Sequence, residues 1–451
     1  MQKKKVAFLT LGCKTNQYET NGMMQKFQEA GYEICALYDE PDIYVVNTCT
    51  VTNIADRKSR QSLRRIKDKK NTIIVACGCY AQVAKEQLEQ IPEIDIVLGN
   101  KEKKDIVKYV EQYIENSQKD TNLHMDFQTK EIISEKRRPS QMVKVADISK
   151  QKEFDEYGCI TYTEKARTTI KIQDGCNNFC SYCLIPYARG RIRSRKRENI
   201  IKEAENIAKQ GIKEIILTGI HIASYGKDFE EEYKLIDLLE DLNKVEGIER
   251  IRLGSLEPSL ITEEFTNRLA KLDKTCNHFH LSLQSGCDET LKRMNRKYTT
   301  SEFKEVTKRL RNNFKDVNLT TDVIVGFPGE TEEEFNKTYK FLKDICFYKM
   351  HVFKYSKRDG TVAATMPNQV DGSIVEQRSK KLIELSNQNQ ENYNKQYIGK
   401  EIEVLFEEKQ GEYWIGHTKN YMVVKFKSEE NLENIIKKVK INKVNCEELV
   451  H

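Results

Sequence analysis

Short runs of apolar and β-branched residues recur along the first 115 residues, and polar or amphipathic stretches separate them. An apolar run bounded by polar segments is typical of a buried strand, whereas the stretches between the runs are typical of helices. The predicted strands cover residues 6–13, 42–49, 72–79 and 94–100. Because strands and helices alternate, we predict a doubly wound α/β domain with a parallel sheet over residues 1–115.

The strand-then-helix pattern returns after a polar stretch. Residues 116–160 are charge-mixed and weakly periodic, which indicates a linker with at most one hairpin. Between residues 161 and 392 we predict six strands separated by amphipathic helices, at 167–173, 212–219, 248–255, 278–284, 319–326 and 348–355. Six units are two fewer than in a full eight-unit barrel, so the pattern predicts a partial (β/α)6 barrel with an open side. Such an opening is wide enough for a macromolecular substrate.

The last segment, residues 393–451, has a different pattern. Apolar and polar positions alternate in KEIEVLFEE, GEYWIGHT, YMVVKFK and IIKKVKINKV, as they do in antiparallel strands with one buried face. We predict a small antiparallel β-barrel there. Basic small barrels often bind nucleic acid, although a packing module would explain the same pattern.

Composition and charge restrict the class of protein. Apolar residues make up 38% and charged residues 32%, which suits a soluble chain with buried cores. The net charge is +6, so any nucleic-acid binding must come from local basic patches. No apolar run reaches the roughly 18–20 residues of a membrane span, and the first residues lack a signal-peptide pattern. We therefore expect a cytoplasmic protein without a membrane partner.

Three of the thirteen cysteines directly follow predicted N-terminal strands. Cys13, Cys49 and Cys79 each lie just beyond an apolar run, where the carboxyl ends of parallel strands carry functional groups. Cysteines that only filled a core would have no reason to share this position, so we predict one shared metal-cluster site. The sequence VACGCY leaves Cys77 as an alternative ligand. Alternation along the strand and the turn that Gly78 permits favour Cys79.

A second cysteine group, CNNFCSYC, follows the first predicted barrel strand and contains Cys176, Cys180 and Cys183. The spacing also fits three buried thiols on one helix face. The Gly, Asn and Ser residues around them disfavour a helix and add no apolar neighbours. A structural zinc site or an iron–sulfur cluster normally takes four protein ligands. Three ligands leave one metal position vacant, which suggests chemistry and counts against structural zinc.

The spacing C-x3-C-x2-C, after a strand at the head of a partial barrel, resembles the radical S-adenosylmethionine superfamily. The resemblance implies that Cys176, Cys180 and Cys183 hold a [4Fe–4S] cluster whose fourth iron binds S-adenosylmethionine. It implies that an electron passes through this cluster to give a 5′-deoxyadenosyl radical, with a donor such as flavodoxin or ferredoxin. It also implies that Tyr182 packs near the adenine.

The motifs LGCKTNQYE, NTCTVT and GCYAQ, ahead of DGCNNFCSYCLIPYARGRIRSR, extend the resemblance to the methylthiotransferase family over nearly the whole chain. The family implies a flavodoxin-like N-terminal domain in which Cys13, Cys49 and Cys79 hold a second [4Fe–4S] cluster. This cluster carries sulfur, from a source that the sequence does not reveal. The family also implies a TRAM-like C-terminal barrel that binds RNA.

Further motifs indicate one branch of that family. LTGIHIASYG, LKRMNRKYT, HVFKYSKRDGT and GHTKNYMVVKF most resemble the branch that modifies N6-threonylcarbamoyladenosine at position 37 of tRNA. The product would be its 2-methylthio derivative. The branches for isopentenyladenosine in tRNA and for an aspartate of ribosomal protein S12 are alternatives, and so is a metal-cluster RNA-binding protein without catalysis.

Two further groups of residues are candidate ligand contacts. Residues that end the central barrel strands are expected to contact S-adenosylmethionine: Thr218, Gly219, Ser255, Glu257, Gln284 and Asp322. Basic residues near the second cysteine group and in the last segment are expected to contact tRNA: Arg189, Arg191, Arg193, Arg195, Lys419 and Lys425. A solvated helix face explains the other basic run, residues 56–70, equally well. His221 and His351 have no partner at ligand spacing, so we do not expect them to be metal ligands.

Overall fold

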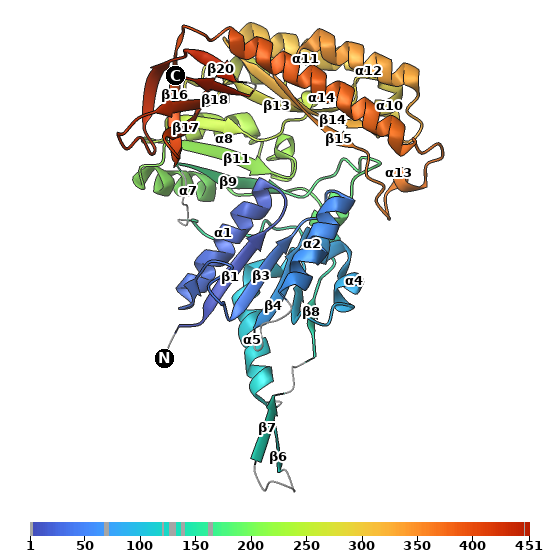
Figure 1. Cartoon of the computed structure of the whole chain (residues 1–451), viewed down its shortest axis with the longest axis vertical. Helices are drawn as coiled ribbons and strands as arrows, with labels where there is room; N and C mark the ends of the chain where they lie inside the picture. Colours follow the sequence, from blue (N-terminus) through green and yellow to red (C-terminus); the bar gives the residue numbers. More distant parts are fainter. Residues whose placement is uncertain are drawn as a thin grey trace. The chain divides into compact units, whose positions relative to one another are not determined.

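The apolar runs of the first 100 residues form one parallel sheet, as the pattern predicts (Figure 1). The computed structural model describes residues 3–66, 72–119, 121–125, 132–136, 140–160, 166–445 and 447–451. The strands of the first sheet are β1 (Lys5–Thr10), β2 (Glu33–Ile34), β3 (Ile43–Thr48), β4 (Ile73–Gly78), β5 (Ile96–Leu98) and β8 (Met142–Lys144). Their order is β2-β1-β3-β4-β5-β8, and every neighbouring pair is parallel. The α/β prediction for this region is confirmed.

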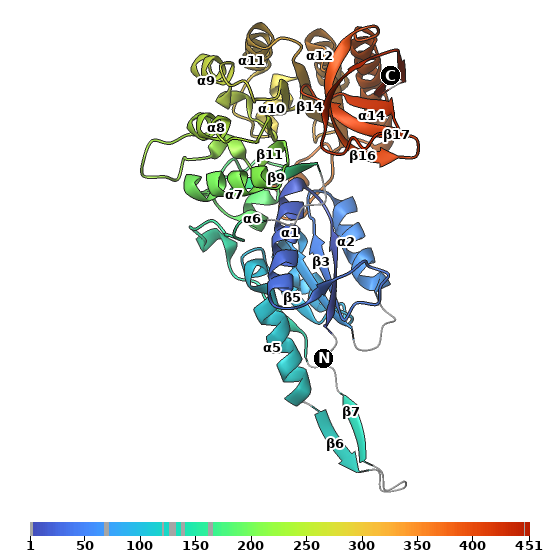
Figure 2. The same cartoon turned by 90° about the vertical axis from the view of Figure 1, so that its left-hand side faces the viewer.

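Helices cover both faces of this sheet (Figure 2). On one face lie α1 (Lys14–Glu29) and α5 (Ile106–Lys119), with a 3-10 turn at Glu102–Asp105 before α5; on the other lie α2 (Asn53–Arg65), α3 (Cys79–Val83) and α4 (Lys85–Glu89). Strand side chains alternate between the faces, so Val45 belongs to one apolar core and Val46 to the other.

The segment at 116–160 takes part in the first sheet. Its hairpin pairs β6 (Thr121–Met125) with β7 (Ile132–Lys136). The strand β8 follows, lies parallel to β5 and is an edge strand of the first sheet. A 3-10 turn at Ile148–Lys150 comes next. The chain divides into two compact units, Met1–Tyr162 with Leu184–Arg191 and Thr163–Cys183 with Ile192–His451.

The second unit contains the six predicted barrel strands. They are β9 (Arg167–Asp174), β11 (Glu214–Gly219), β12 (Arg250–Leu253), β13 (His278–Gln284), β14 (Asn318–Val325) and β15 (Lys349–Lys354). They lie in two sheets, β10-β9-β11-β12 and β13-β14-β15, in which only the short β10 (Arg193–Ser194) is antiparallel. Parallel bridges at Ile251–Thr275 and Leu256–Leu281 connect the two sheets. The prediction of a partial six-stranded barrel is therefore confirmed.

Amphipathic helices surround these strands on the outside and bury one continuous apolar core against them. They are α7 (Arg197–Lys209), α8 (Leu235–Asn243), α9 (Glu263–Leu269), α10 (Asp288–Arg293), α11 (Thr300–Asn313), α12 (Glu332–Ile345) and α14 (Gly372–Lys395), with shorter turns at Ile222–Ser224, Pro258–Leu260 and α13 (Val362–Thr365). Local sequence fixes their starts. At α12, Thr331 accepts a hydrogen bond from the Glu334 backbone and Glu334 accepts one in return.

The C-terminal segment forms a six-stranded sheet. Its strands are β16 (Glu401–Gln410), β17 (Tyr413–Thr418), β18 (Val423–Lys427), β19 (Ile436–Lys440), β20 (Lys443–Asn445) and β21 (Glu448–Val450). The order is β19-β16-β17-β18-β21-β20, antiparallel except that β18 and β21 are parallel. The run predicted as one strand at 435–444 is two strands, β19 and β20. No helix in the described ranges is long and apolar enough to cross a membrane.

Candidate functional site

Three thiols converge on the carboxyl edge of the N-terminal sheet. Cys13 caps the start of α1, Cys49 directly follows β3, and Cys79 begins α3 immediately after β4. Gly12 has a φ of +101°, and a Cβ atom there would lie 2.7 Å from Sγ of Cys49. The Cys49 side chain therefore packs against the backbone next to Cys13. Burial raises the pKa of the Cys49 thiol to about 11, and the nearby sulfurs of Cys79 and Cys13 add to this shift.

The neighbouring thiols Cys77 and Cys79 have different surroundings. Cys77 is fully buried in the apolar core under α1 and α5, and burial raises the pKa of its thiol to about 12. Gly78 has a φ of +100°, and the Asn47 Oδ1 and Thr48 carbonyl oxygens lie 2.6 Å from where its Cβ would be. This glycine turn directs Cys79 to the strand edge, which supports the preference for Cys79 over Cys77 as a ligand.

A buried group of charges adjoins Cys79. Arg189, on α6 (Ile185–Arg189), donates from Nε to Sγ of Cys79 at 3.0 Å and from Nη2 to Oδ1 of Asn16 at 2.5 Å. Arg189 also forms an ion pair with Glu19, and Lys103 forms a second one with the same carboxylate. The side chains of Arg189, Asn16, Glu19 and Lys103 are almost fully buried. We expected Arg189 to contact tRNA, but its guanidinium is buried and donates to Cys79 instead.

The second cysteine group lies on an irregular loop directly after β9. Within CNNFCSYC no residue is helical, so the single-helix interpretation of its spacing is wrong. Phe179 adopts a φ of +48°. The segment after α10 holds the loop: Asn295 Nδ2 donates to the Phe179 carbonyl at 2.9 Å, and Ser181 Oγ donates to the Arg293 carbonyl at 2.8 Å.

A buried arginine also approaches this second set of thiols. Arg296 donates from Nη1 to Sγ of Cys180 at 3.3 Å and from Nη2 to the Ser282 carbonyl at 3.1 Å. Its guanidinium lies 3.5 Å from the carboxylate of Glu257. Sequence reasoning missed Arg296, although it lies in the phrase LKRMNRKYT. Since guanidinium groups remain protonated, Arg296 is a permanent positive charge beside Cys180.

Glu257 connects that arginine with the cysteine loop. It accepts a hydrogen bond from Asn178 Nδ2 at 2.6 Å and pairs with His221. Burial alone would raise the pKa of Glu257, but the hydrogen bond from His221 and the charge of Arg296 lower it to about 2. Glu257 is therefore an anion at neutral pH, suited to bind a cationic ligand group. His221, for which no role was predicted, orients this carboxylate.

Both thiol sets fit an iron–sulfur cluster. Hydrogen bonds to sulfur are among the contacts by which proteins tune such clusters, and each set receives one from a buried arginine. Among the described residues, neither set gathers its three sulfurs within the 4.8 Å of a single-ion site. A four-iron cluster binds its thiolates on separate irons, so the three sulfurs need not meet around one ion.

Comparisons with known proteins agree with this geometry. The family model described as "Radical SAM superfamily" matches residues 170–342, and "Uncharacterized protein family UPF0004" matches residues 5–99. The chain is 43% identical to the threonylcarbamoyladenosine tRNA methylthiotransferase MtaB of Bacillus subtilis, over 97% of this chain and 94% of the relative. The chain belongs to the radical S-adenosylmethionine tRNA methylthiotransferase family. The resemblance seen in the sequence is thus confirmed, and it implies S-adenosylmethionine and a [4Fe–4S] cluster.

Other relatives define the breadth of this methylthiotransferase family. A tRNA-2-methylthio-N(6)-dimethylallyladenosine synthase of Alkaliphilus oremlandii is 34% identical over 98% of this chain and 91% of the relative. Among solved structures, the radical S-adenosylmethionine methyltransferase TsrM of Kitasatospora setae has a TM-score of 0.58 at 16% identity, over 80% of this chain and 77% of that one. This structural likeness shows the fold.

The predicted S-adenosylmethionine contacts of this methylthiotransferase lie mainly at the carboxyl ends of the barrel strands. Thr218 and Gly219 end β11, Ser255 and Glu257 follow β12, and Gln284 ends β13. Tyr182 packs with Met294, Phe327 and Ala363, its ring centroid 6.3 Å from that of Phe327. Asp322 differs from the rest because it lies in the middle of β14, deeper in the barrel.

Two of the arginines after the cysteine loop, which we expected to contact tRNA, are buried. Arg193 is buried 3.5 Å from Asp174, and Arg195 is buried in an ion pair with Glu203. Each arginine therefore neutralises an internal carboxylate of the barrel. Arg191 is exposed. Position next to the cysteine motif and positive charge predicted ligand contact, but three of the four arginines, Arg189, Arg193 and Arg195, are buried.

The two lysines proposed for tRNA contact are also engaged within the protein. Lys425 pairs with Glu448 at 2.8 Å, and Lys419 donates to the Asp273 carbonyl. Lys419 lies in the turn between β17 and β18. The Thr418 carbonyl at the end of β17 accepts from Arg252 on β12, and the Asn420 carbonyl accepts from Asn318, the first residue of β14. The phrase GHTKNY thus packs at the amino-terminal ends of the barrel strands, opposite the cysteine loop.

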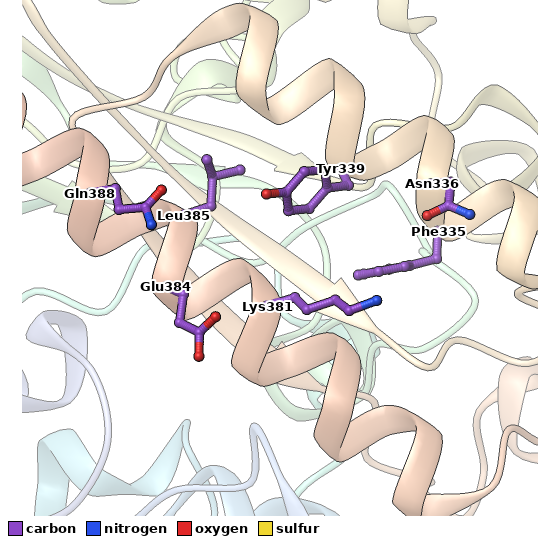
Figure 3. Close-up of a pocket in the computed structure, with 7 residues that line it drawn as sticks. All are labelled: Phe335, Asn336, Tyr339, Lys381, Glu384, Leu385 and Gln388. Atoms are coloured by element: carbon purple, nitrogen blue, oxygen red, sulfur yellow. The ribbon is translucent and has the colours of Figure 1, made fainter.

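A pocket of about 330 Å³ lies on the outer helical layer (Figure 3). Its lining comes from α12 and α14: Phe335, Asn336, Tyr339, Lys381, Glu384, Leu385 and Gln388. None of the cysteines or predicted ligand contacts lines this pocket, so we do not place the reaction there.

Proposed function

We propose that this chain methylthiolates C2 of N6-threonylcarbamoyladenosine at position 37 of tRNA, giving the 2-methylthio derivative. The observation that carries the proposal is the pair of three-thiol sites in one chain. Its similarity to relatives named for this reaction supports the substrate: they are 43% and 40% identical, against 33–36% for relatives named for dimethylallyladenosine.

In this proposal, Cys176, Cys180 and Cys183 hold a [4Fe–4S] cluster and S-adenosylmethionine. When bound, the cluster supplies the electron that starts the radical reaction. Glu257 is the anion available for the amino group of S-adenosylmethionine, and Tyr182 offers an aromatic face within an apolar cluster. Arg296 holds Cys180 and Glu257 in one hydrogen-bonded group. Thr218, Gly219, Ser255 and Gln284 form the surrounding rim.

Cys13, Cys49 and Cys79 hold the second [4Fe–4S] cluster, which carries sulfur. Arg189 supports this assignment because it donates to Cys79 and brings a positive charge to a site that would hold thiolates. We propose that flavodoxin or ferredoxin is the electron donor and that the protein is cytoplasmic.

The C-terminal half-barrel is the proposed tRNA-binding module, TRAM-like in its role, over residues 393–451. With Lys419 and Lys425 in internal contacts, the better candidates are Lys438 and Lys440. Both are exposed on β19, on either side of the buried Val439. Arg191, which is exposed in the stretch after the cysteine loop, is a further candidate. Cationic side chains of this kind bind phosphates without reading sequence.

Cysteine variants of the reconstituted enzyme test the two-site assignment. We expect about eight irons per chain in the wild type and about four in either Cys49→Ala or Cys180→Ala. Cys180→Ala should form no 5′-deoxyadenosine, whereas Cys49→Ala should still form it without methylthiolating RNA. Cys77→Ala is the matched control and should keep both activities. Loss of 5′-deoxyadenosine in Cys49→Ala as well would contradict separate roles.

Nucleosides from tRNA of a strain lacking this gene test the substrate. We expect the 2-methylthio derivative of threonylcarbamoyladenosine to disappear and its precursor to accumulate. Loss of the isopentenyladenosine derivative, or of the methylthio group on protein S12, would instead indicate one of the other branches. Intact S-adenosylmethionine under strong reductant, together with persistent RNA binding, would indicate a non-catalytic protein.

A further inference from the structure

Three polar side chains gather on adjacent strands of the barrel. His280 lies on β13, Asp322 on β14 and His351 on β15, one residue from each of three adjacent strands. One nitrogen or oxygen from each lies within 4.8 Å of the others, and His280 Nε2 lies 3.2 Å from Asp322 Oδ2. Asp322 and His351 are direct partners in the strand register. We call this trio the His–Asp–His group.

The alternation of β15 shows which face carries this group. Met350 is buried in the helical core and Val352 packs against it, while α14 covers that face. His351 and Phe353 therefore point to the opposite, concave face. Since β15 is the last strand of its sheet, the group lies beside the open side of the partial barrel. Phe353 is 45% exposed there, so its ring is accessible for stacking.

Hydrogen bonds hold the ring of His280 in place and leave the ring of His351 available to a ligand. Thr320 Oγ1 lies 3.0 Å from His280 Nδ1, so both ring nitrogens of His280 are engaged. Among the described residues, the ring of His351 has no hydrogen-bond partner. Desolvation lowers the pKa of His351 below its ordinary value. The neutral ring offers one N–H donor and one acceptor at the open side.

We propose that the His–Asp–His group and Phe353 form the subsite that recognises the N6 substituent of the target adenosine. This inference depends on the proposed function, because it explains how the chain selects threonylcarbamoyladenosine. The threonylcarbamoyl substituent has urea N–H donors, carbonyl and carboxylate oxygens, and a hydroxyl. Asp322 accepts from a urea N–H, His351 donates to a substituent oxygen, and His280 holds the Asp322 carboxylate in place. Phe353 packs against the flat base or urea plane.

The same subsite disfavours a dimethylallyl substituent. The dimethylallyl chain is apolar and adds no donor or acceptor beyond N6–H, so its binding would desolvate Asp322 and His351 without supplying the hydrogen bonds of the outer urea N–H, the carbonyl and the carboxylate. A site built to hydrogen-bond its substrate discriminates strongly against an analogue that lacks the polar groups. The subsite thus accounts chemically for a preference between the two kinds of tRNA substrate named for the relatives.

Two anticodon stem-loop RNAs, one with threonylcarbamoyladenosine and one with isopentenyladenosine at position 37, test the subsite with the reconstituted enzyme. We expect His351→Phe to lower kcat/KM for the first RNA at least tenfold while changing little for the second. His351→Gln should recover much of the loss because it keeps a donor. Asp322→Asn should also lower kcat/KM for the first RNA. Lys354→Gln, an exposed change on the same strand, is the matched control.

Three measurements separate the possible outcomes. Iron content and the formation of 5′-deoxyadenosine without RNA should be unchanged in His351→Phe, which shows that the fold and radical site are intact. Equal kcat/KM of His351→Phe and wild type on the first RNA would overturn the subsite while leaving the proposed function in place. A wild type that modifies only the second RNA would overturn both. One equivalent of zinc or manganese in wild type, lost in His351→Phe, would identify a metal site and overturn substrate recognition.

Discussion

The most demanding prediction concerns the buried charges next to Cys79. Glu19 pairs with two cations, Lys103 and Arg189, and all three side chains have 2% exposure or less. One carboxylate against two cations leaves one positive charge in excess. The thiolate of Cys79, which receives a hydrogen bond from Arg189, would compensate this charge when a cluster is bound. We therefore predict how each substitution in the group changes stability.

The loss in free energy of unfolding expected for each variant depends on the buried charge that the substitution leaves without a partner. Glu19→Gln leaves two buried cations without an anion, and loss of one partner of a buried ion pair costs about 3–5 kcal/mol. Arg189→Met leaves the Glu19–Lys103 pair intact and removes charged hydrogen bonds, worth about 1.5–3 kcal/mol each in other proteins. We expect about 4 kcal/mol for Glu19→Gln and about 2–3 kcal/mol for Arg189→Met.

Calorimetry of the full-length protein measures this ranking. For a domain of this size, each kcal/mol shifts the midpoint temperature of unfolding by about 2–4 °C, so Glu19→Gln should lower the midpoint of the N-terminal transition by roughly 8–16 °C. Arg189→Met should lower it by roughly half as much. Arg64→Met, an exposed change on α2, is the matched control and should stay within about 0.5 kcal/mol of wild type. Chelator should also remove iron from Arg189→Met at least about tenfold faster, because Cys79 loses its donor.

Two results would refute this reasoning. If Arg189→Met were as stable as Arg64→Met, the buried contacts of Arg189 would not exist in solution. If Glu19→Gln were less destabilising than Arg189→Met, Glu19 would not be the counter-ion of both cations. Either result would remove the electrostatic argument for a cluster on Cys79.

Three further predictions concern other parts of the chain. Gly12→Ala should lower iron content by up to half, since its Cβ would collide with Cys49 and its φ is positive; iron assay of the reconstituted protein measures this. Burial alone would raise the pKa of Glu214, but Arg252 and the neighbouring arginines lower it to about 2. The ionised Glu214 carboxylate therefore contributes its full stability above about pH 4.5, and this contribution is lost as the pH falls towards 2. Between these two pH values, the urea midpoint of Glu214→Gln should fall less than the urea midpoint of wild type. Arg296→Met should slow 5′-deoxyadenosine formation at least tenfold, and an unchanged rate would show that its contact with Cys180 is irrelevant.

Local pattern was sufficient to predict the main strands of both sheets and the positions of the cysteines at their ends, but not the edge strand β8. The run before Cys49 is mostly apolar because both faces of β3 are buried. The end of this strand, and with it the position of Cys49, could therefore be predicted from the sequence. The choice between Cys77 and Cys79 followed from alternation and a glycine turn. Both arguments use only neighbouring residues along the chain, whose local geometry the sequence determines directly.

Contacts between distant segments were not predictable in this way. The His–Asp–His group draws one residue from each of three strands, so no spacing in the sequence reveals it. Arg296 reaches Cys180 from a loop more than a hundred residues away. The burial of Arg193 and Arg195 depends on carboxylates elsewhere in the chain, Asp174 and Glu203. The positive charge of the run ARGRIRSRKR suggests exposed side chains, but ion pairs with those carboxylates hold both arginines in the interior.

The cysteine motif of the barrel continues into residues that serve the other unit. Cys183 ends the thiol set, but the next eight residues, 184–191, pack with the N-terminal unit, where Arg189 donates to Cys79. Two residues after this segment the chain is back in the barrel, and Arg193 pairs with Asp174. A substitution such as Arg189→Met therefore changes the N-terminal thiol site while leaving the barrel thiols in place. One short stretch of sequence therefore supplies Cys183 to the barrel thiol set and Arg189 to the N-terminal thiol set, so substitutions in it act on one site or the other according to their position.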